Sequence, residues 1–354
     1  MEAPREAVFE ALGRVIDPEL GRPVTELDMV RDVRIDGPDV AVTIALTVVG
    51  CPLRSSFEEQ VAREVGELPG VRSVSLSFDV MSPEEKAALT KKLRGGVAER
   101  SNGISVDAST RVVAVASGKG GVGKSSLTVN LAAALSRFGQ RVGILDADIY
   151  GHSVPHLLGV TQRPIVVDEM IVPPVLDGLK LMSIGFFLDE NAPVMWRGPM
   201  LHRALEQFLS DVHWGTLDTL FVDMPPGTGD VSISLGQLLP RAEALIVTTP
   251  QPLAQEVAVR AALMAQKTNL RVIGVVENMT SEVFGSGGGD QLAARLGVSL
   301  LGRVPLDARL RECGDAGTPL VWTEPDTPAA RAIFEVADAV VAAKQTFKPL
   351  PLVS

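Results

Sequence analysis

The chain has 354 residues, of which 46% are hydrophobic, 21% charged and 4% aromatic, and its net charge is −10. This length allows one large core and a further small domain, and the scarcity of aromatic residues favours packed α/β layers over a β-sandwich. The negative charge disfavours nucleic acid as a partner, and the lack of any run of about 18 apolar residues argues against a membrane span.

The two cysteines, Cys51 and Cys313, bear on the cellular compartment. So few cysteines in so long a chain argue against a disulfide framework and for a reducing environment. The first residues, Met1 to Glu6, do not combine a basic region with an apolar one, as a secretory signal would. We therefore expect a cytoplasmic protein.

Residues 1–93 are predicted to form a small α+β domain. The most strand-like part lies near 40–49, and a helix is expected to begin at Ser82-Pro83, because a serine cap followed by proline is a common helix start. The other expected elements are a helix near 4–15, a helix near 55–68 and a strand near 71–79. A polar stretch with glycines follows, so residues 94–110 are expected to be a linker.

Residues 111–345 alternate strands with helices and are predicted to form the main domain. The candidate strands are short runs rich in Val, Ile and Leu at 111–116, 141–146, 218–223, 243–248, 271–276 and 299–304. Such runs suit strands that are buried on both faces, and the intervening helices imply a mainly parallel, doubly wound sheet. Its ligand is expected beyond the carboxyl ends of the strands. Residues 346–354 are a tail whose prolines exclude an amphipathic membrane helix.

A phosphate-binding loop follows the first of these strands. The sequence Gly118-Lys119-Gly120-Gly121-Val122-Gly123-Lys124-Ser125 has a glycine, four free positions and then Gly-Lys-Ser. Glycines let backbone N–H groups turn toward phosphate oxygens, Lys124 can reach the β- and γ-phosphates, and Ser125 offers a hydroxyl to Mg²⁺. A helix expected from Ser126 to Arg137 adds a favourable dipole. The alternative interpretation is a glycine-rich turn without a ligand.

Two further strands end in carboxylates. Asp223 ends an apolar strand, where a carboxylate near a phosphate loop typically holds Mg²⁺. The loop after it contains prolines and then glycines such as Gly227, and can sense a γ-phosphate. Its alternative is an ordinary turn in which Asp230 caps the next helix. Asp146 and Asp148 are two residues apart, so they share one face of an extended segment and can converge on Mg²⁺ and the attacking water. The alternative interpretation is that Asp148 caps the turn that follows.

Lys119 is not required by the general loop pattern, and by itself it is a solvated surface lysine. With its neighbours, Ser117–Ser125 resembles the deviant phosphate loop of the MinD/ParA superfamily. Residues 146–151, 223–230, 274–279 and 284–289 narrow the resemblance to one branch of this superfamily. This is the Mrp/ApbC branch, the P-loop ATPases that carry iron–sulfur clusters. The likeness covers residues 108–345. It implies a slow, Mg²⁺-dependent ATPase that binds ATP as a homodimer and serves apo-protein clients of iron–sulfur assembly.

The same resemblance implies roles for individual residues. Lys119 would neutralise phosphate charge in the partner's site, and Asp148 would orient the attacking water. Asp146 and Asp223 would serve Mg²⁺ with Ser125, and Asn278 would hydrogen-bond adenine. The nucleotide would be held by Gly118, Lys119, Gly120, Gly121, Val122, Gly123, Lys124, Ser125, Ser126 and Gly227. The segment Trp196-Arg197-Gly198-Pro199 also looks like the family's, but no role follows for it.

Residues 6–80 resemble the PaaD-like domain of iron–sulfur maturation proteins. The matching segments are Asp17–Leu20, Val24–Val30 and Gly50–Leu53. Asp17-Pro18-Glu19 can equally be a helix cap, a proline and an acidic first turn. Cys51 precedes the expected helix near 55–68, and a thiol at a helix N-terminus is shifted toward the thiolate that binds metal, here an iron–sulfur cluster. The alternative for Cys51 is a small buried hydrophobe.

The chain departs from the family between Asn278-Met279 and Phe284-Gly285. Most carriers of this type have Cys-x-x-Cys there, whereas this chain has only Thr280-Ser281-Glu282-Val283. The usual bridging cluster site is therefore not expected, and Cys313 is expected to be structural. Two functions stay open: an ATP-hydrolysing cluster carrier or assembly factor that uses Cys51, and a nucleotide-dependent switch that docks partners without a cluster.

Overall fold

The structure is a computed structural model that describes residues 3–48, 53–94, 103–188, 198–227 and 229–343. The chain forms two compact units. The first consists of Met1–Asp107, Arg163–Val175 and Leu209–Gly215, and the second of Ala108–Gln162, Leu176–Phe208 and Thr216–Ser354. The smaller unit thus includes two segments from the middle of the chain, which no pattern in the sequence had assigned to it.

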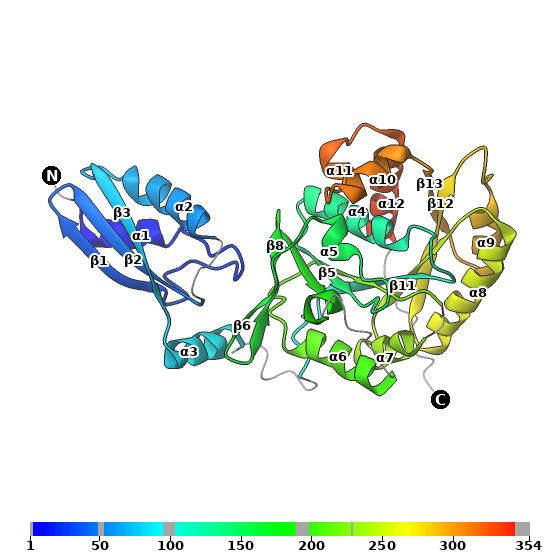
Figure 1. Ribbon diagram of the computed structural model, residues 1–354, viewed down its shortest axis with the longest axis horizontal. Coiled ribbons are helices and arrows are strands. Elements are labelled where there is room, and N and C mark those ends of the chain that lie inside the picture. The colour runs from blue at the N-terminus through cyan, green and yellow to red at the C-terminus, as the bar shows by residue number, and fades with distance from the viewer. Residues whose placement is uncertain (1–2, 49–52, 95–102, 189–197, 228, 344–354) are drawn as a thin grey trace, which may run out of the picture. The chain divides into compact units, whose positions relative to one another are not determined.

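The smaller unit is an α+β fold around a three-stranded sheet (Figure 1). Its elements are α1 (Arg5–Leu12), β1 (Val30–Asp36), β2 (Asp39–Leu46), α2 (Arg54–Gly66), β3 (Ser73–Val80) and α3 (Pro83–Arg94). β2 lies in the middle, antiparallel to β1 and parallel to β3. The predicted strands and helices are therefore present, and β1 is an additional edge strand.

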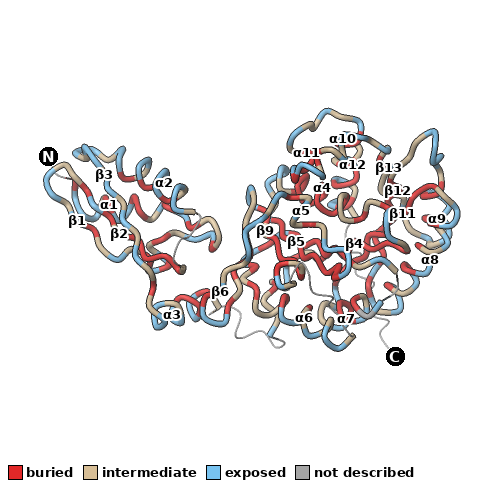
Figure 2. Tube along the Cα trace, viewed as in Figure 1, coloured by how far each residue is buried: buried red, intermediate tan, exposed pale blue. Residues whose placement is uncertain are grey.

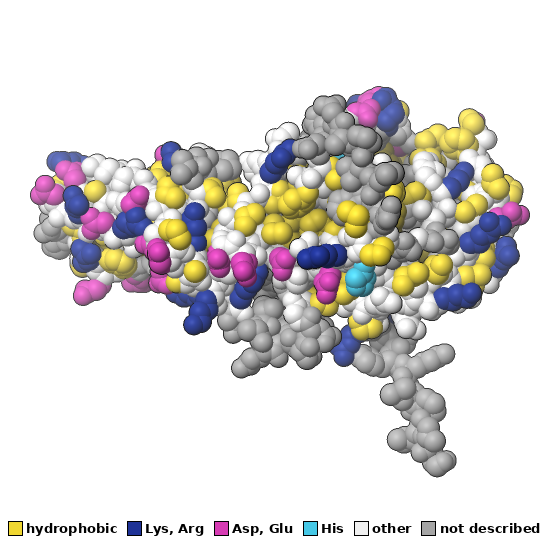
Figure 3. All heavy atoms as spheres, turned by 60° about the horizontal axis from the view of Figure 1, so that its bottom comes forward, with side chains coloured by type: hydrophobic (Ala, Val, Ile, Leu, Met, Phe, Trp, Pro, Cys, Tyr) yellow, Lys and Arg dark blue, Asp and Glu magenta, His cyan; other side chains and the backbone are white. Residues whose placement is uncertain are grey.

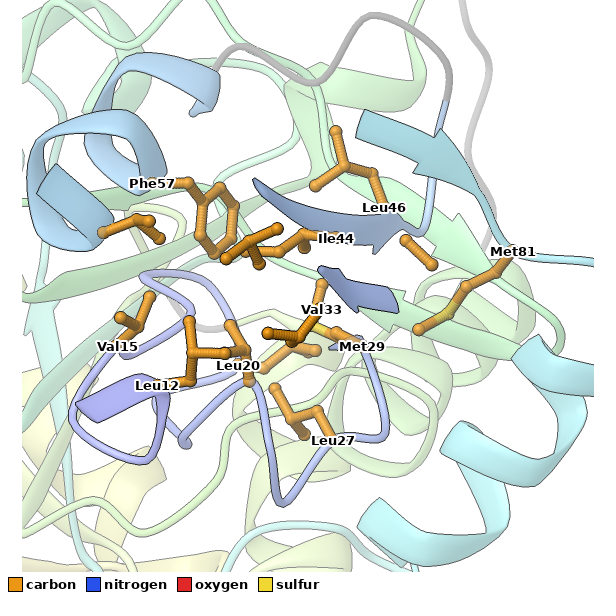
Figure 4. Packing of buried hydrophobic residues seen from close by; sticks show 14 of the residues in the cluster. Leu12, Val15, Leu20, Leu27, Met29, Val33, Ile44, Leu46, Phe57 and Met81 are labelled. Carbon is orange, nitrogen blue, oxygen red and sulfur yellow. The ribbon is translucent and has the colours of Figure 1, made fainter. Parts of the chain in front are cut away.

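The core of this unit explains why a distant hairpin belongs to it. Figure 4 shows Leu12, Ile44 and Phe57, from three different elements, in one apolar cluster. The hairpin of β6 (Ile165–Val167) and β7 (Met170–Val172) adds Val167, Met170 and Val172 to the same cluster. The buried hydroxyl of Thr90 on α3 also donates to the carbonyl of Val167 at 3.1 Å. Apolar burial is the main stabilising term in such a small unit.

The larger unit contains an eight-stranded sheet in the order β13-β12-β11-β4-β10-β5-β9-β8. The strands are β4 (Arg111–Ser117), β5 (Val142–Asp146), β8 (Val175–Leu176), β9 (Leu179–Ser183), β10 (Thr219–Asp223), β11 (Glu243–Thr248), β12 (Arg271–Thr280) and β13 (Leu300–Pro305). All neighbours from β13 to β9 pair in parallel. The central strands are buried along almost their whole length (Figure 2).

Helices cover both faces of this sheet, with α4 and α12 on one side and α6 and α7 on the other (Figure 1). The helices are α4 (Lys124–Arg137), α5 (Val154–Leu157), η1 (Ile184–Phe187), α6 (Gly198–Ser210), α7 (Asp230–Leu238), α8 (Pro252–Lys267), α9 (Gly288–Leu296), α10 (Ala308–Asp315), α11 (Leu320–Thr323) and α12 (Pro328–Ala342). The prediction of a mainly parallel, doubly wound α/β sheet is confirmed. In the described ranges, no helix has both the length and the apolar character needed to cross a membrane.

Surface charge is mixed on the face shown in Figure 3. Lys and Arg side chains alternate there with Asp and Glu side chains among the described residues. Arg31, for example, pairs with both Asp79 and Glu85, and Arg72 pairs with Asp39.

Candidate functional site

The phosphate-binding loop connects the end of β4 at Ser117 to the start of α4 at Lys124. Gly121 and Gly123 have φ angles of 77° and 79°, a left-handed conformation that favours glycine. Gly118 is constrained by packing, because a Cβ atom there would lie 2.3 Å from the carbonyl carbon of Val257 on α8. The glycines thus give the loop its shape and allow α8 to approach it.

A cavity of about 700 Å³ opens at the carboxyl ends of β4, β5 and β10. The loop residues 119–126 line one side of it, and Asp148, Tyr150 and Leu201 contribute to the rest. Ligands of open parallel sheets bind at this edge. The cavity therefore lies where the sequence predicts a nucleotide.

Lys124 lies at the centre of the polar groups in this site. Its side chain is only 7% exposed, and its Nζ atom lies 2.8 Å from Asp223 Oδ2 and 3.7 Å from Asp148 Oδ2. Nζ also donates to the hydroxyl of Ser125 at 3.2 Å. A buried ammonium group needs such counter-charges, and phosphate oxygens can take their place.

Asp223, at the end of β10, is fully buried and accepts hydrogen bonds from α4 on both carboxylate oxygens. Ser125 donates to Oδ2 at 2.6 Å, and Thr128 donates to Oδ1 at 2.9 Å. The parallel register of β10 and β5 sets Asp223 opposite Asp146. The two strand-end carboxylates predicted from the sequence are therefore neighbours.

The carboxylate of Asp146 is held by three hydrogen bonds from neighbouring residues. It accepts hydrogen bonds from the hydroxyl of Ser183 at 3.0 Å and from the backbone N–H groups of Asp148 and Val154 at 3.2 and 3.3 Å. Burial, together with the charge of Asp223, raises the pKa of Asp146 to about 8. Burial also raises the pKa of Asp148, against the opposing effect of Lys124.

Asp148 takes part in a turn and also lines the cavity, while its role toward Mg²⁺ and the attacking water stays a prediction. Its Oδ1 atom accepts a hydrogen bond from the backbone N–H of Gly151 at 3.1 Å, which closes a turn, while the side chain also lines the cavity. Gly227 is docked on the end of β4, because its N–H donates to the carbonyl of Ser117 at 2.8 Å. The next helix has Gly229 at its N-cap position and begins at Asp230, so the part of the alternative interpretation that made Asp230 the cap is wrong.

Asn278 supports the phosphate-binding loop from β12. Its amide Nδ2 donates to the carbonyl of Val122 at 2.9 Å, and the residue is 3% exposed. It does not line the described cavity. A contact between Asn278 and adenine stays a prediction.

The backbone N–H groups of the second glycine-rich segment, at Gly287 and Gly289, are bound by a carboxylate of the chain itself. Glu277 is fully buried on β12 and accepts hydrogen bonds from the N–H groups of Gly287 and Gly289 at 3.2 and 3.1 Å. Arg303 on β13 adds an ion pair to Glu277 at 3.2 Å. The chain's own anion therefore occupies the N-terminus of α9.

The remaining predicted residues are less closely tied to the site. Lys119 is partly buried and lines the cavity, and no described residue forms an ion pair with it. Cys51, Trp196 and Arg197 lie outside the described residues. Cys313 is buried on α10, as the structural interpretation expects, and its Sγ atom lies 3.5 Å from Thr323 Oγ1.

Asp17 does not begin a helix, in contrast to one of the alternatives drawn from the sequence. Its Oδ1 atom accepts hydrogen bonds from the backbone N–H groups of Glu19 and Leu20 at 2.9 and 2.8 Å, and Gly21 follows in a left-handed conformation. These bonds close a turn of the kind that Asp commonly caps.

The donor set fits Mg²⁺ that arrives with a nucleotide. Within the described ranges, no three His, Cys, Asp or Glu side chains gather into a ready-made metal site. Mg²⁺ in nucleotide sites needs only one or two carboxylates, a hydroxyl and phosphate oxygens. Ser125, which lines the cavity, and Asp223, to which Ser125 donates a hydrogen bond, supply such oxygens.

Sequence reasoning missed two hydroxyl groups of this site, Thr128 on Asp223 and Ser183 on Asp146. Each is fully buried. The signal available for Thr128 is its spacing of four residues from Lys124, which sets both on one face of α4. No comparable signal points to Ser183, because its contact depends on β9 lying beside β5.

Comparison with known proteins gives consistent matches. The family model described as NUBPL iron-transfer P-loop NTPase matches residues 108–341, and that of iron-sulfur cluster assembly protein matches residues 5–76. An iron-sulfur cluster carrier protein from Mycobacterium leprae is 50% identical over 95% of this chain and 92% of its own length. One from Synechocystis is 41% identical over 95% of this chain and 96% of its own length.

Solved structures resemble the larger unit. A nucleotide-binding protein from Archaeoglobus fulgidus, in complex with ADP, is 37% identical, with a TM-score of 0.54, and the match covers 65% of this chain and 93% of that one. The septum site-determining protein MinD from Pyrococcus horikoshii, with Mg-ADP, is 23% identical, with a TM-score of 0.51 over 65% of this chain and 96% of that one. At this lower identity the likeness to MinD shows the fold alone.

Proposed function

The chain belongs to the family of iron-transfer P-loop NTPases, and from this membership we propose that it carries or assembles iron–sulfur clusters while binding and hydrolysing ATP as an ATP-dependent homodimer. The observation that carries the proposal is the convergence of Lys124 and Ser125, which line a nucleotide-sized cavity, on the buried carboxylate of Asp223. The complete phosphate-binding loop beside them supplies the backbone N–H donors that a triphosphate requires.

The residues of the site would act on the nucleotide as follows. Lys124 would exchange its carboxylate partners for β- and γ-phosphate oxygens, and Ser125 would release Asp223. Mg²⁺ bound with the nucleotide would neutralise phosphate charge, held by oxygens of Ser125 and Asp223. Asp148 faces the cavity beside Lys124, and its raised pKa makes its carboxylate a better proton acceptor for an attacking water.

Lys119 supports the homodimer in this proposal. A protein with a net charge of −10 that buries two triphosphates at one seam needs additional cations there. Lys119 lines the cavity and has no described counter-ion, so its ammonium group is free to serve the nucleotide of a second copy. Hydrolysis would be slow in the single chain because the second copy completes the site.

The cluster is the cargo, and Cys51 is the residue proposed to contact it. Cys313 is buried on α10 and unsuited to exchange a cluster with a client. Cys51 sits before α2, within the segment that matches the iron-sulfur cluster assembly family. Client apo-proteins would supply thiolates that this chain lacks.

One observation favours a second candidate, a nucleotide switch that docks partners without holding a cluster. The turn after β12 contains no cysteine and is closed by two backbone hydrogen bonds between Ser281 and Gly285, at 2.7 and 3.2 Å. The cluster-binding motif expected at this turn in most such carriers is replaced by a short, closed connection.

Anaerobic reconstitution with iron and sulfide separates the two candidates. We expect the wild-type chain and Cys313→Ser to take up iron and sulfide, and Cys51→Ser to take up at least about tenfold less, because thiolates are the ligands of these clusters. Full cluster absorbance in Cys51→Ser would remove Cys51 from the mechanism. ATP-dependent dimerisation without any cluster in the wild type would favour the switch.

A further inference from the structure

We infer that Thr128 is a positioning residue, which fixes Oδ1 of Asp223 so that Oδ2 of the same carboxylate faces the divalent metal bound with the nucleotide. The inference rests on the proposed function, since it concerns the same nucleotide site. It assigns a role to a residue that lies outside the phosphate-binding motif.

The position of Thr128 suits it to this role. It lies one turn after Lys124 on α4, is fully buried, and its Oγ1 atom is 2.9 Å from Asp223 Oδ1. Oγ1 is also 2.9 Å from the carbonyl of Lys124, but a hydroxyl has only one proton to donate. An ionised carboxylate is a stronger acceptor than a carbonyl, which already accepts a helix hydrogen bond. The proton of Thr128 is therefore directed to Asp223.

The two oxygens of Asp223 have different neighbours. Oδ2 is 2.6 Å from Ser125 Oγ and 2.8 Å from Lys124 Nζ, and these are the two groups that phosphate and metal would claim. When they turn to the nucleotide, Thr128 is the one remaining side-chain partner of Asp223 among those that the structure describes. Oδ2 is then left without these two partners, while Oδ1 stays held.

The neighbouring carboxyl group supplies no other hold on Asp223. Asp146 lies opposite Asp223 in the register of β5 and β10, but no hydrogen bond joins the two side chains among the described residues. Asp146 is instead fixed by Ser183 and by two backbone N–H groups. Once Lys124 and Ser125 turn to the nucleotide, the carboxylate of Asp223 would be free to rotate without the hydroxyl of Thr128.

Binding measurements on the full-length chain test the inference. The variants are Thr128→Val, which keeps the shape and loses the hydroxyl, and Thr128→Ser, which keeps the hydroxyl. ATP binding is followed by calorimetry across a Mg²⁺ series and in EDTA. We compare the Mg²⁺ concentration at which half of the Mg²⁺-dependent gain in ATP affinity is reached. This concentration should be about tenfold higher in Thr128→Val and within about twofold of the wild type in Thr128→Ser. Affinity in EDTA should change less than about twofold in both.

Controls keep the result open to refutation. Thr90→Val removes a buried hydroxyl bond in the smaller unit and should leave the Mg²⁺ dependence unchanged. If Thr128→Val does not fold, Thr128→Ala replaces it and should show the same Mg²⁺ shift. An unchanged Mg²⁺ requirement without the hydroxyl, or an equal shift in Thr128→Ser, would overturn the inference. Failure of the wild type to bind ATP with Mg²⁺ would instead overturn the proposed function.

Discussion

Replacing Asp146 with Asn should change how the stability of the larger unit depends on pH. In the folded chain the pKa of Asp146 is raised from 3.8 to about 8, chiefly by burial and then by the charge of Asp223. Between these two values the folded state holds one proton more than the unfolded state. The free energy of unfolding therefore falls as pH rises, by about 1.4 kcal/mol for each pH unit, and levels off above the folded pKa.

An amide at position 146 has nearly the same shape and no charge to bury. From pH 5 to pH 7 the wild type should lose about 3 kcal/mol relative to Asp146→Asn, which is two pH units of the slope given above. The assay is urea unfolding followed by circular dichroism, in EDTA and without nucleotide, at several pH values. Comparison of the two chains at each pH removes the contribution of every other titrating group that they share.

Asp218→Asn is the matched control for this experiment. Asp218 is an exposed residue whose pKa is lowered to about 2 by hydrogen bonds from Arg141, so its stabilising effect is present above pH 3.8 and is lost only as pH falls through the folded pKa. Its curve should run parallel to that of the wild type between pH 5 and 7. Parallel curves for Asp146→Asn as well would refute the reasoning, because they would mean that Asp146 is ionised in the folded chain.

Two further variants probe the phosphate-binding loop. Lys119→Ala should abolish ATP-dependent dimerisation, which light scattering with ATP would show as the loss of the dimer peak. The control Lys267→Ala, at the exposed end of α8, should dimerise normally. A stable dimer in Lys119→Ala would contradict the proposed role of Lys119. Gly118→Ala should lower stability by about 1–3 kcal/mol and weaken ATP binding, because its new Cβ would lie 2.3 Å from a backbone carbon of Val257. Gly120→Ala is its control, since open space surrounds that position, and equal behaviour of the two variants in thermal melting would exclude the clash.

The central sheet was predictable because its strands carry their own signal. Runs such as those of β4 and β10 are apolar between their end residues, as burial on both faces requires, and each leads directly to a polar motif. β1 was not predicted because it is an edge strand whose charged residues face solvent, and Val33 is its only fully buried member. β9 is short and includes Lys180, so its pattern alone does not indicate a strand.

The sequence predicts those site residues that belong to one local motif. It does not predict contacts between side chains from segments that are distant in the sequence. Lys124 and Ser125 follow from a local motif, and Asp223 follows from the end of a strand. The contacts of Thr128 and Ser183 arise from the order of strands and the packing of α4, which no local pattern specifies. The turn at Asp17 was ambiguous because the same residue types begin helices and cap turns.

The buried carboxylate of Glu277 bears on stoichiometry. The chain has two glycine-rich loops that lead into helices, and each could in principle accept an anion. Glu277 and its partner Arg303 fill the second of them from within, so a free phosphate ester would have to displace a covalently tethered competitor. Of these two described loops, we therefore expect only the one at Gly118–Ser125 to take a triphosphate, which corresponds to one nucleotide for each copy of the chain.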